Sequence, residues 1–348
     1  MSNFSEQDLI KWGEILFSNS VRRKSSKTND MLKPSSLNSK TVSRRNYQKL
    51  EAADVKAALL RTVKKVPEVN VKVTGMGKSI VQIKSHMDYI ARTHEKDESL
   101  HKSLEDQDGN LYFGADDLLD LRDQWQDGRH VIPLTAGAKA ESFNLVLSMP
   151  PGTNREAVHL AARDFGNAVF YGKNDYAFTS HDDTTHPHVH MVVKAVGYDG
   201  KRMRPWKKDL HAWRETFAEK LREHGVEANA TKKYVRGSIR ENEKRSVIAA
   251  EREGKLLKKK KPRSTVDRTL DVLSQSHGVA LRAYREISKT LAASDHEADR
   301  NLAKDVTKFV DQMAYEKAFE QREQTKQKSI PSREQNTQSI KVEKDKEK

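Results

Sequence analysis

The sequence predicts an α+β protein built around a mainly antiparallel sheet. Strand-like segments with alternating apolar residues are interspersed with amphipathic helical segments between about Val69 and Gly225. Short turn signals between neighbouring strand segments, such as Asp108-Gly109, favour hairpins. After about Lys233 the strand patterns stop and helical spacing takes over. These observations favour a sheet with flanking helices, followed by a mostly helical C-terminal region.

Each element follows from a local pattern. The β-branched or alternating segments expected as strands are 68–75, the hairpin 105–114, 141–153 with its Pro-Pro-Gly stop, 175–181 and 188–193. The segments with helical spacing are 7–17, 51–66, the run from the Gly-Met-Gly turn to Arg92, 116–128, 154–170 and 208–225. Asn154 is the expected N-cap of the 154–170 helix, and Gly225 ends the last one.

Composition narrows the class of protein. The 348 residues carry 64 Lys+Arg against 50 Asp+Glu, a net charge of +14, and no cysteine. The missing cysteines exclude a disulfide scaffold and thiolate metal sites, and they fit a reducing cytoplasm. No segment reaches the ~18–20 apolar residues of a membrane span. The excess of basic residues indicates a polyanionic partner, in the first place nucleic acid.

Changes in composition predict four regions. Residues 1–67 form a polar extension that we expect to be partly disordered, and 68–235 form the domain with the sheet. Residues 236–320 form a basic helical region that contains the run "KLLKKKKPR". Residues 321–348 are charged, lack aromatic residues and are expected to be disordered.

Four of the 13 histidines lie within ten positions, in "HDDTTHPHVH". On a strand, His188 and His190 share one face, while the alternate apolar residues share the other, core-facing side. If 182–187 connect two antiparallel strands, His181 lies opposite His188 and Thr179 opposite His190, which places three imidazoles on one open face. Three neutral histidines with a free fourth position suit a divalent metal that binds a substrate oxygen.

The plainer interpretation is that alternating histidines are exposed polar residues without a ligand, and for His-x-His alone it is favoured. With the third histidine, His181, a metal site becomes the favoured interpretation. His186 lies in the connecting loop and is either a DNA contact, a support for a ligand, or without a role. Asp183 could orient a liganding imidazole through its free N–H, or could be a solvated turn residue.

A three-histidine site in a basic protein suggests phosphodiester chemistry, which needs a nucleophile. Cysteine is absent, so tyrosine, serine and metal-bound water remain. In "GKSIVQIKSHMDYIAR" the apolar residues Ile80, Ile83, Met87 and Ile90 form one helical stripe, and Tyr89 lies about 140° from its centre at ~100° per residue. Tyr89 is therefore expected outside the core, as many exposed tyrosines are.

Three segments in order carry a resemblance to a known family: "HMDYIAR", "LVLSMPPGTNREAV" and "HDDTTHPHVHMVV". They resemble relaxases of the plasmid mobilisation and T-DNA border endonuclease class, the MOBP group of the HUH endonucleases. The last segment agrees with the pattern His-x-Asp-x-x-x-Pro-His-x-His at every defined position. The resemblance covers roughly half of the chain, from about Val69 to Lys233.

The resemblance implies a five-stranded antiparallel sheet with flanking helices and a tyrosine that attacks one DNA strand at a transfer origin. It implies Tyr89 as the nucleophile, Asp183 as the supporting carboxylate, and His181, His188 and His190 as ligands of Mg²⁺ or Mn²⁺. The implied partners are single-stranded and supercoiled transfer-origin DNA, accessory nicking proteins and the coupling protein of a type IV secretion system. Cytoplasmic DNA processing during conjugation follows from the same resemblance.

Several basic side chains are expected to contact DNA. They are Lys78, Arg92, Lys194, Lys258, Lys259, Lys260 and Lys261; a solvated linker is the plainer alternative for the last four, and DNA contact is favoured. Lys194 stands where the family often has asparagine, which is a departure from the pattern. The segment "TGMGKS" resembles a phosphate-binding ATPase loop, but Lys72 occupies the place of its first glycine.

Two alternatives stay open. A rolling-circle replication initiator shares the histidine pair and the tyrosine, but its tyrosine usually follows the histidines, whereas Tyr89 precedes them. A non-catalytic DNA-binding protein whose histidines hold a metal would form no covalent DNA adduct.

Overall fold

The computed structural model describes residues 4–17, 50–126, 130–237 and 265–313. These residues divide into two compact units, which are treated separately. One comprises Lys64–Ala230 and holds the sheet. The other combines described segments from both ends of the chain, before Val63 and after Thr231.

The sheet of the 64–230 unit has six strands in the order β1-β4-β6-β5-β2-β3, and all neighbouring strands are antiparallel. The strands are β1 Asn70–Gly77, β2 Leu104–Asp106, β3 Leu111–Tyr112, β4 Ser142–Ser148, β5 Tyr176–His181 and β6 His188–Lys194. The α+β class with an antiparallel sheet is confirmed. The sheet has six strands instead of the five that the resemblance implied: β1, β4, β5 and β6 make four, and the short β2–β3 hairpin adds two at the edge of β5.

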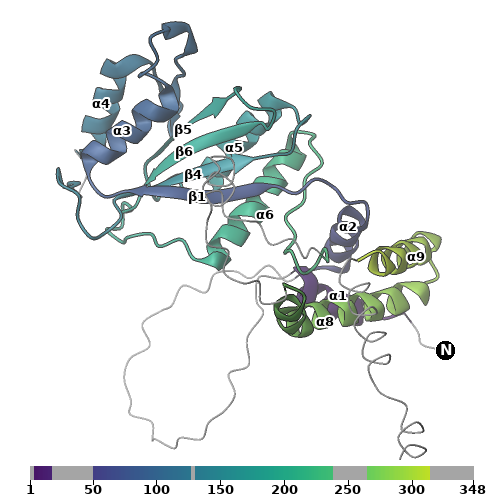
Figure 1. Ribbon diagram of the computed structural model, residues 1–348. Helices are drawn as coiled ribbons and strands as arrows, with labels where there is room; N and C mark the ends of the chain where they lie inside the picture. The colour runs from purple at the N-terminus through teal and green to yellow at the C-terminus, as the bar shows by residue number, and fades with distance from the viewer. Residues whose placement is uncertain (1–3, 18–49, 127–129, 238–264, 314–348) are drawn as a thin grey trace, which may run out of the picture. The chain divides into compact units, whose positions relative to one another are not determined.

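Helices cover both faces of this sheet (Figure 1). They are α3 Ile80–Ala91, α4 Gly114–Gln126, α5 Arg155–Val169 and α6 Lys207–Glu223, with the short η1 Glu98–Leu100 after α3. Asn154 caps α5 as predicted, because its side chain accepts a hydrogen bond from the amide of Ala157. Arg92 ends α3 in a left-handed conformation with φ of 59°.

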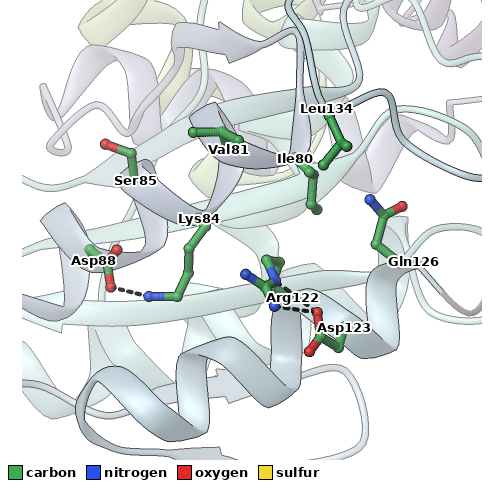
Figure 2. Close-up of a pocket in the computed structure, with 9 residues that line it drawn as sticks. All are labelled: Ile80, Val81, Lys84, Ser85, Asp88, Arg122, Asp123, Gln126 and Leu134. Carbon is green, nitrogen blue, oxygen red and sulfur yellow. Dashed lines mark hydrogen bonds and ion pairs between the residues drawn. The ribbon is translucent and has the colours of Figure 1, made fainter.

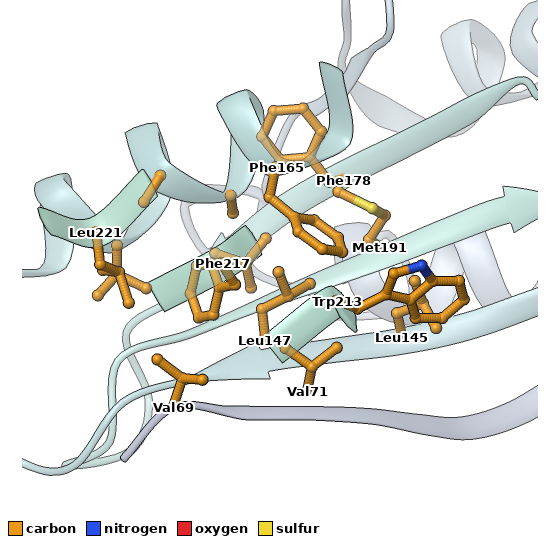
Figure 3. Close-up of a cluster of buried hydrophobic side chains, with 14 of the residues drawn as sticks. Val69, Val71, Leu145, Leu147, Phe165, Phe178, Met191, Trp213, Phe217 and Leu221 are labelled. Carbon is orange, nitrogen blue, oxygen red and sulfur yellow. The ribbon is translucent and has the colours of Figure 1, made fainter. Parts of the chain in front are cut away.

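One face of the sheet packs on α5 and α6. Val189, Met191 and Val193 are fully buried there, as their alternation in the sequence predicted. Phe165 of α5 makes edge-to-face contacts with Phe170 and with Phe217 of α6. Figure 3 shows Phe165, Phe217 and Met191 among the side chains that lie between the helices and the strands.

The opposite face packs on α3 and α4. The predicted stripe of α3 is buried there, with Ile80 at 3% exposure and Ile83, Met87 and Ile90 at none. Val192 and Ala177 of the sheet belong to the same cluster. The face that carries the histidines is therefore open only in part: α3 and α4 cover it around Ala177 and Val192, and His181 is buried, whereas His188 and His190 are partly exposed.

The other unit consists of four described helices, α1 Glu6–Phe17, α2 Ala52–Val63, α8 Thr265–Ala292 and α9 Glu297–Asp311. Their apolar faces share one core, which includes Leu9, Leu59, Tyr284 and Phe309. The predicted helical spacing after residue 265 thus corresponds to real helices. No described helix of the chain is both long enough and apolar enough to cross a lipid bilayer.

Candidate metal centre and nucleophile

The β5–β6 hairpin brings three histidines together. His181 pairs with His188, and Thr179 with His190, which confirms the predicted register. The ring centroids of His181 and His190 are 4.5 Å apart, and those of His188 lie 5.4 Å and 5.2 Å from them. One ring nitrogen of each histidine lies within 4.8 Å of the corresponding atoms of the other two. The three imidazoles therefore offer a set of donors that one ion could share.

Backbone carbonyls determine which nitrogens stay free. Nε2 of His181 lies 2.6 Å from the carbonyl oxygen of Ile90, and Nδ1 of His188 lies 2.9 Å from that of His186. A carbonyl only accepts, so each of these nitrogens carries the proton in the neutral ring. The other nitrogen of each ring then keeps its lone pair for a ligand.

The environment favours the neutral form of two of these histidines. Burial, together with the neighbouring His181, His188 and His86, lowers the pKa of His190 to about 3. Burial also lowers the pKa of His181, which is only 5% exposed. A neutral imidazole is the form that binds a metal, so no proton has to be displaced from His181 or His190 at neutral pH. The set of three imidazole donors fits a divalent ion.

Asp183 lies beside the histidines and is paired with Arg92. Its Oδ2 is 2.7 Å from Nη2 of Arg92, and its Oδ1 is 3.8 Å from Nε2 of His188. Burial raises the pKa of Asp183, but Arg92, His181 and His188 together outweigh burial and lower it. The N–H groups of His181 and His188 have carbonyls as partners, so Asp183 contributes a negative charge on the free-nitrogen side of His188.

Tyr89 lies at the histidine end of α3. The next residue, Ile90, supplies the carbonyl that His181 contacts. Tyr89 itself is 60% exposed, in agreement with its predicted position outside the apolar stripe. The centroid of its ring lies 6.2 Å from that of His86 and 6.1 Å from that of His94, and its ring is nearly parallel to that of His94. The phenol is thus reachable from solvent beside the histidine set.

His86 was not predicted as a site residue. Burial lowers its pKa to about 4, and its Nε2 is buried without a hydrogen-bond partner among the described residues. The signal available in the sequence was its i, i+3 spacing from Tyr89, which places both on adjoining parts of the helix surface. Arg155 was also missed: it donates to the carbonyls of His181 and Thr184 and so holds the loop between β5 and β6.

Only some of the predicted DNA contacts lie near the histidines. Arg92 lies there, because it forms an ion pair with Asp183. Lys78 precedes α3, whose 12 residues span about 18 Å, so it lies at the far end from Tyr89. Lys194 is only 4% exposed and donates to the carbonyl of Trp125, so it is unsuited to meet a DNA strand. Lys258–Lys261 lie outside the described residues.

A cavity of about 440 Å³ lies between α3 and α4 (Figure 2). Lys84 and Asp88 line one side as an ion pair, and Arg122 and Asp123 line the other as a second. None of the histidines lines it, nor does Tyr89. The predicted chemistry is therefore at the end of α3 and not in this cavity.

The structure thus has an antiparallel sheet with His-x-His on a central strand and an exposed tyrosine on a helix that contacts it. Residues 85–226 match the family model described as relaxase, MobA/VirD2-like, nuclease domain. This segment includes Tyr89 and the three clustered histidines. The resemblance seen in the sequence is confirmed for this part of the chain, which is similar to relaxase nuclease domains.

Individual relatives agree with this assignment. The chain is 29% identical over 104 residues to the T-DNA border endonuclease VirD2 of Agrobacterium fabrum, and equally to those of Rhizobium radiobacter and Rhizobium rhizogenes. The matched part is 27% of this chain and spans only 23–24% of the length of these relatives. The likeness thus concerns the nuclease domain.

Proposed function

We propose that the protein is a relaxase that cuts one DNA strand at a plasmid transfer origin and later rejoins it. The observation that carries the proposal is the exposed Tyr89 beside three convergent histidines. The relaxase family of the domain and its likeness to VirD2, a border endonuclease, support the same activity. Conjugative transfer or mobilisation, with accessory nicking proteins and a secretion coupling protein, is the process that this activity would serve in the cytoplasm.

In the proposed reaction, the phenolic oxygen of Tyr89 attacks the scissile phosphorus. The phosphorus–oxygen bond to the 3′ side breaks, which leaves a 3′ hydroxyl and a phosphotyrosine at the 5′ end. His181, His188 and His190 would hold Mg²⁺ or Mn²⁺, which supplies charge stabilisation at the phosphate oxygens. Because the phosphotyrosine is a phosphodiester like the bond that was cut, the 3′ hydroxyl can reverse the reaction without a nucleotide cofactor.

The residues around Tyr89 suit this step. A phenol ionises near pH ~10 in its ordinary form, so it needs help to attack at neutral pH. Arg92 lies at the end of the same helix, within reach of the Asp183 carboxylate, and offers a guanidinium for the negatively charged phosphate. The partial burial of the histidines keeps water away from part of the site.

Tyr89→Phe removes one oxygen and keeps the ring. We expect this variant to form no covalent adduct with a single-stranded oligonucleotide from the transfer origin of the protein's own plasmid, while it still binds that DNA. The measurement is a denaturing gel after incubation with Mn²⁺, and peptide mapping then locates the adduct in the unmodified protein. Tyr171→Phe is the control. Tyr171 is similarly exposed but follows the C-terminal end of α5, whereas the N-terminal end of α5 contacts His181 through Arg155.

An adduct mapped to a residue other than Tyr89 would overturn the mechanism. If no adduct formed under any condition, the alternative of a non-catalytic, metal-containing DNA-binding protein would replace the proposal.

A further inference from the structure

We propose that three rings beside Tyr89, two of them exposed and one half-buried, form a stacking surface for the bases of a single DNA strand. The rings are those of His94, His101 and Phe113, here called the ring track. The inference rests on the proposed function, because the strand held by the track is the one presented to Tyr89. None of the three residues belongs to the nucleophile or metal motifs.

The ring track has two ring pairs, Tyr89–His94 and His101–Phe113, which a backbone hydrogen bond links. The ring of His94 is nearly parallel to that of Tyr89, with an angle of 7° and centroids 6.1 Å apart. The next residue after His94, Glu95, accepts a hydrogen bond at its carbonyl from Nε2 of His101 at 3.1 Å. The ring of His101 lies 6.1 Å from that of Phe113, which directly follows β3. The rings thus lead from the nucleophile to the edge strand of the sheet.

The outer end of the track is an exposed apolar surface. Phe113 is 53% exposed, and Leu111 of β3 is 66% exposed. The backbone here is held in place, because the amide of Phe113 donates to the carboxylate of Asp117. A fixed, exposed aromatic ring next to a reactive site is typical of a binding surface, since burial of such a ring in the core would be more favourable.

Charge explains why this part of the protein would need stacking. The Lys64–Ala230 unit has 23 Lys+Arg against 25 Asp+Glu, so the basic excess of the chain lies entirely in the remaining residues. Arg92 and Lys102 near the histidines are each balanced by a carboxylate, Asp183 and Asp182 respectively. Apart from a contact of Arg92 with the scissile phosphate, non-specific attraction of phosphates is therefore weak around Tyr89, and contacts with base faces would supply affinity.

The charged residues between His94 and His101 favour one orientation of the DNA strand on the ring track. Three exposed acidic residues, Glu95, Asp97 and Glu98, and one exposed cation, Lys96, lie between His94 and His101. Their net charge is negative and repels phosphates, so the sugar-phosphate backbone would face away and the bases would face the rings. Every base has a π face, so this surface would bind single strands without selecting their sequence.

The test uses the full-length protein with Tyr89→Phe, which keeps all rings and prevents cleavage. Two fluorescent probes of equal length are compared by anisotropy, a short oligothymidylate and an abasic strand with the same sugar-phosphate backbone. We expect the oligothymidylate to bind more tightly. Phe113→Ala should weaken its binding about fivefold or more, the loss expected for one stacked base, and leave the abasic strand unaffected.

Matched variants separate stacking from folding and from charge. Phe113→Trp should retain the affinity, because it keeps an aromatic face. Tyr171→Ala, at an equally exposed ring at the far end of α5, should have no effect. The dependence of binding on salt should be the same with and without Phe113→Ala, since no phosphate contact is lost.

Equal binding of both probes, or equal losses in Phe113→Ala and Tyr171→Ala, would overturn the ring track. The same holds if Phe113→Ala weakens binding of the abasic strand as much as that of the oligothymidylate. If the covalent adduct forms but Phe113→Ala has no effect, the track is wrong and the relaxase proposal stands. If base-dependent binding is lost in Phe113→Ala but no adduct ever forms, the track stands and the relaxase proposal is wrong.

Discussion

Replacement of Asp183 by asparagine should separate metal binding from stability. The carboxylate pairs with Arg92 at 2.7 Å and lies 3.8 Å from Nε2 of His188, the nitrogen left free for a ligand. Asparagine has almost the same shape but no charge. The substitution therefore removes an attraction for a cation while it leaves the three imidazoles in place.

The expected loss of stability is smaller than the expected loss of metal affinity. The side chain of Asp183 is 46% exposed and that of Arg92 is 18% exposed, so loss of their ion pair should lower the free energy of unfolding by about 1 kcal/mol or less. A supporting group next to a metal site is worth more to the metal, and its loss typically weakens binding about 10- to 100-fold. The variant should thus be folded but poor at binding the ion.

Isothermal titration calorimetry with Mn²⁺ measures the metal affinity of the wild-type and Asp183→Asn proteins, and thermal unfolding measures their stability. Asp182→Asn is the matched control, because Asp182 is adjacent, is 58% exposed and pairs with Lys102 and Arg155 instead. The control should keep its Mn²⁺ affinity. Unchanged affinity in Asp183→Asn, or the same loss in both variants, would refute the role assigned to Asp183.

Three further predictions concern the core, the pH dependence and the salt dependence. Phe165→Ala in the core under the sheet should lower the free energy of unfolding by about 3–5 kcal/mol in urea titrations, and a loss below about 1 kcal/mol would contradict this packing. Burial raises the pKa of Glu141, but the hydrogen bonds and charges of Arg202 and His130 outweigh burial and lower this pKa below the ordinary value of 4.5. The ionised Glu141 therefore stabilises the fold above about pH 4.5, and this stabilisation is lost as the pH falls through the folded pKa. The free energy of unfolding of Glu141→Gln should therefore fall less steeply in acid than that of the wild-type protein. The same fall in both proteins would argue against the ion pairs of Glu141 with Arg202 and His130. Replacement of Lys258–Lys261 by glutamine should reduce the slope of log affinity for single-stranded DNA against log salt by up to about 3, whereas an unchanged slope would make this run a linker.

Local patterns in the sequence determined much of the site. Period-2 alternation placed His188 and His190 on one face of β6, and hairpin pairing placed His181 opposite them, because both depend only on neighbouring residues. Helical spacing likewise separated Tyr89 from the buried stripe of α3. The class of fold followed from the order of such elements.

Only the tertiary structure decided which distant groups support these residues. The contact of His181 with the Ile90 carbonyl joins positions 91 residues apart, and no local pattern encodes it. Burial of Lys194 against Trp125, and the cover that α3 and α4 place over the face with the histidines, depend in the same way on how helices pack on the sheet. Periodicity states which side of an element is apolar but not which element will lie on it, and for that reason the sequence determined the donors of the site and the fold determined their burial, protonation and partners.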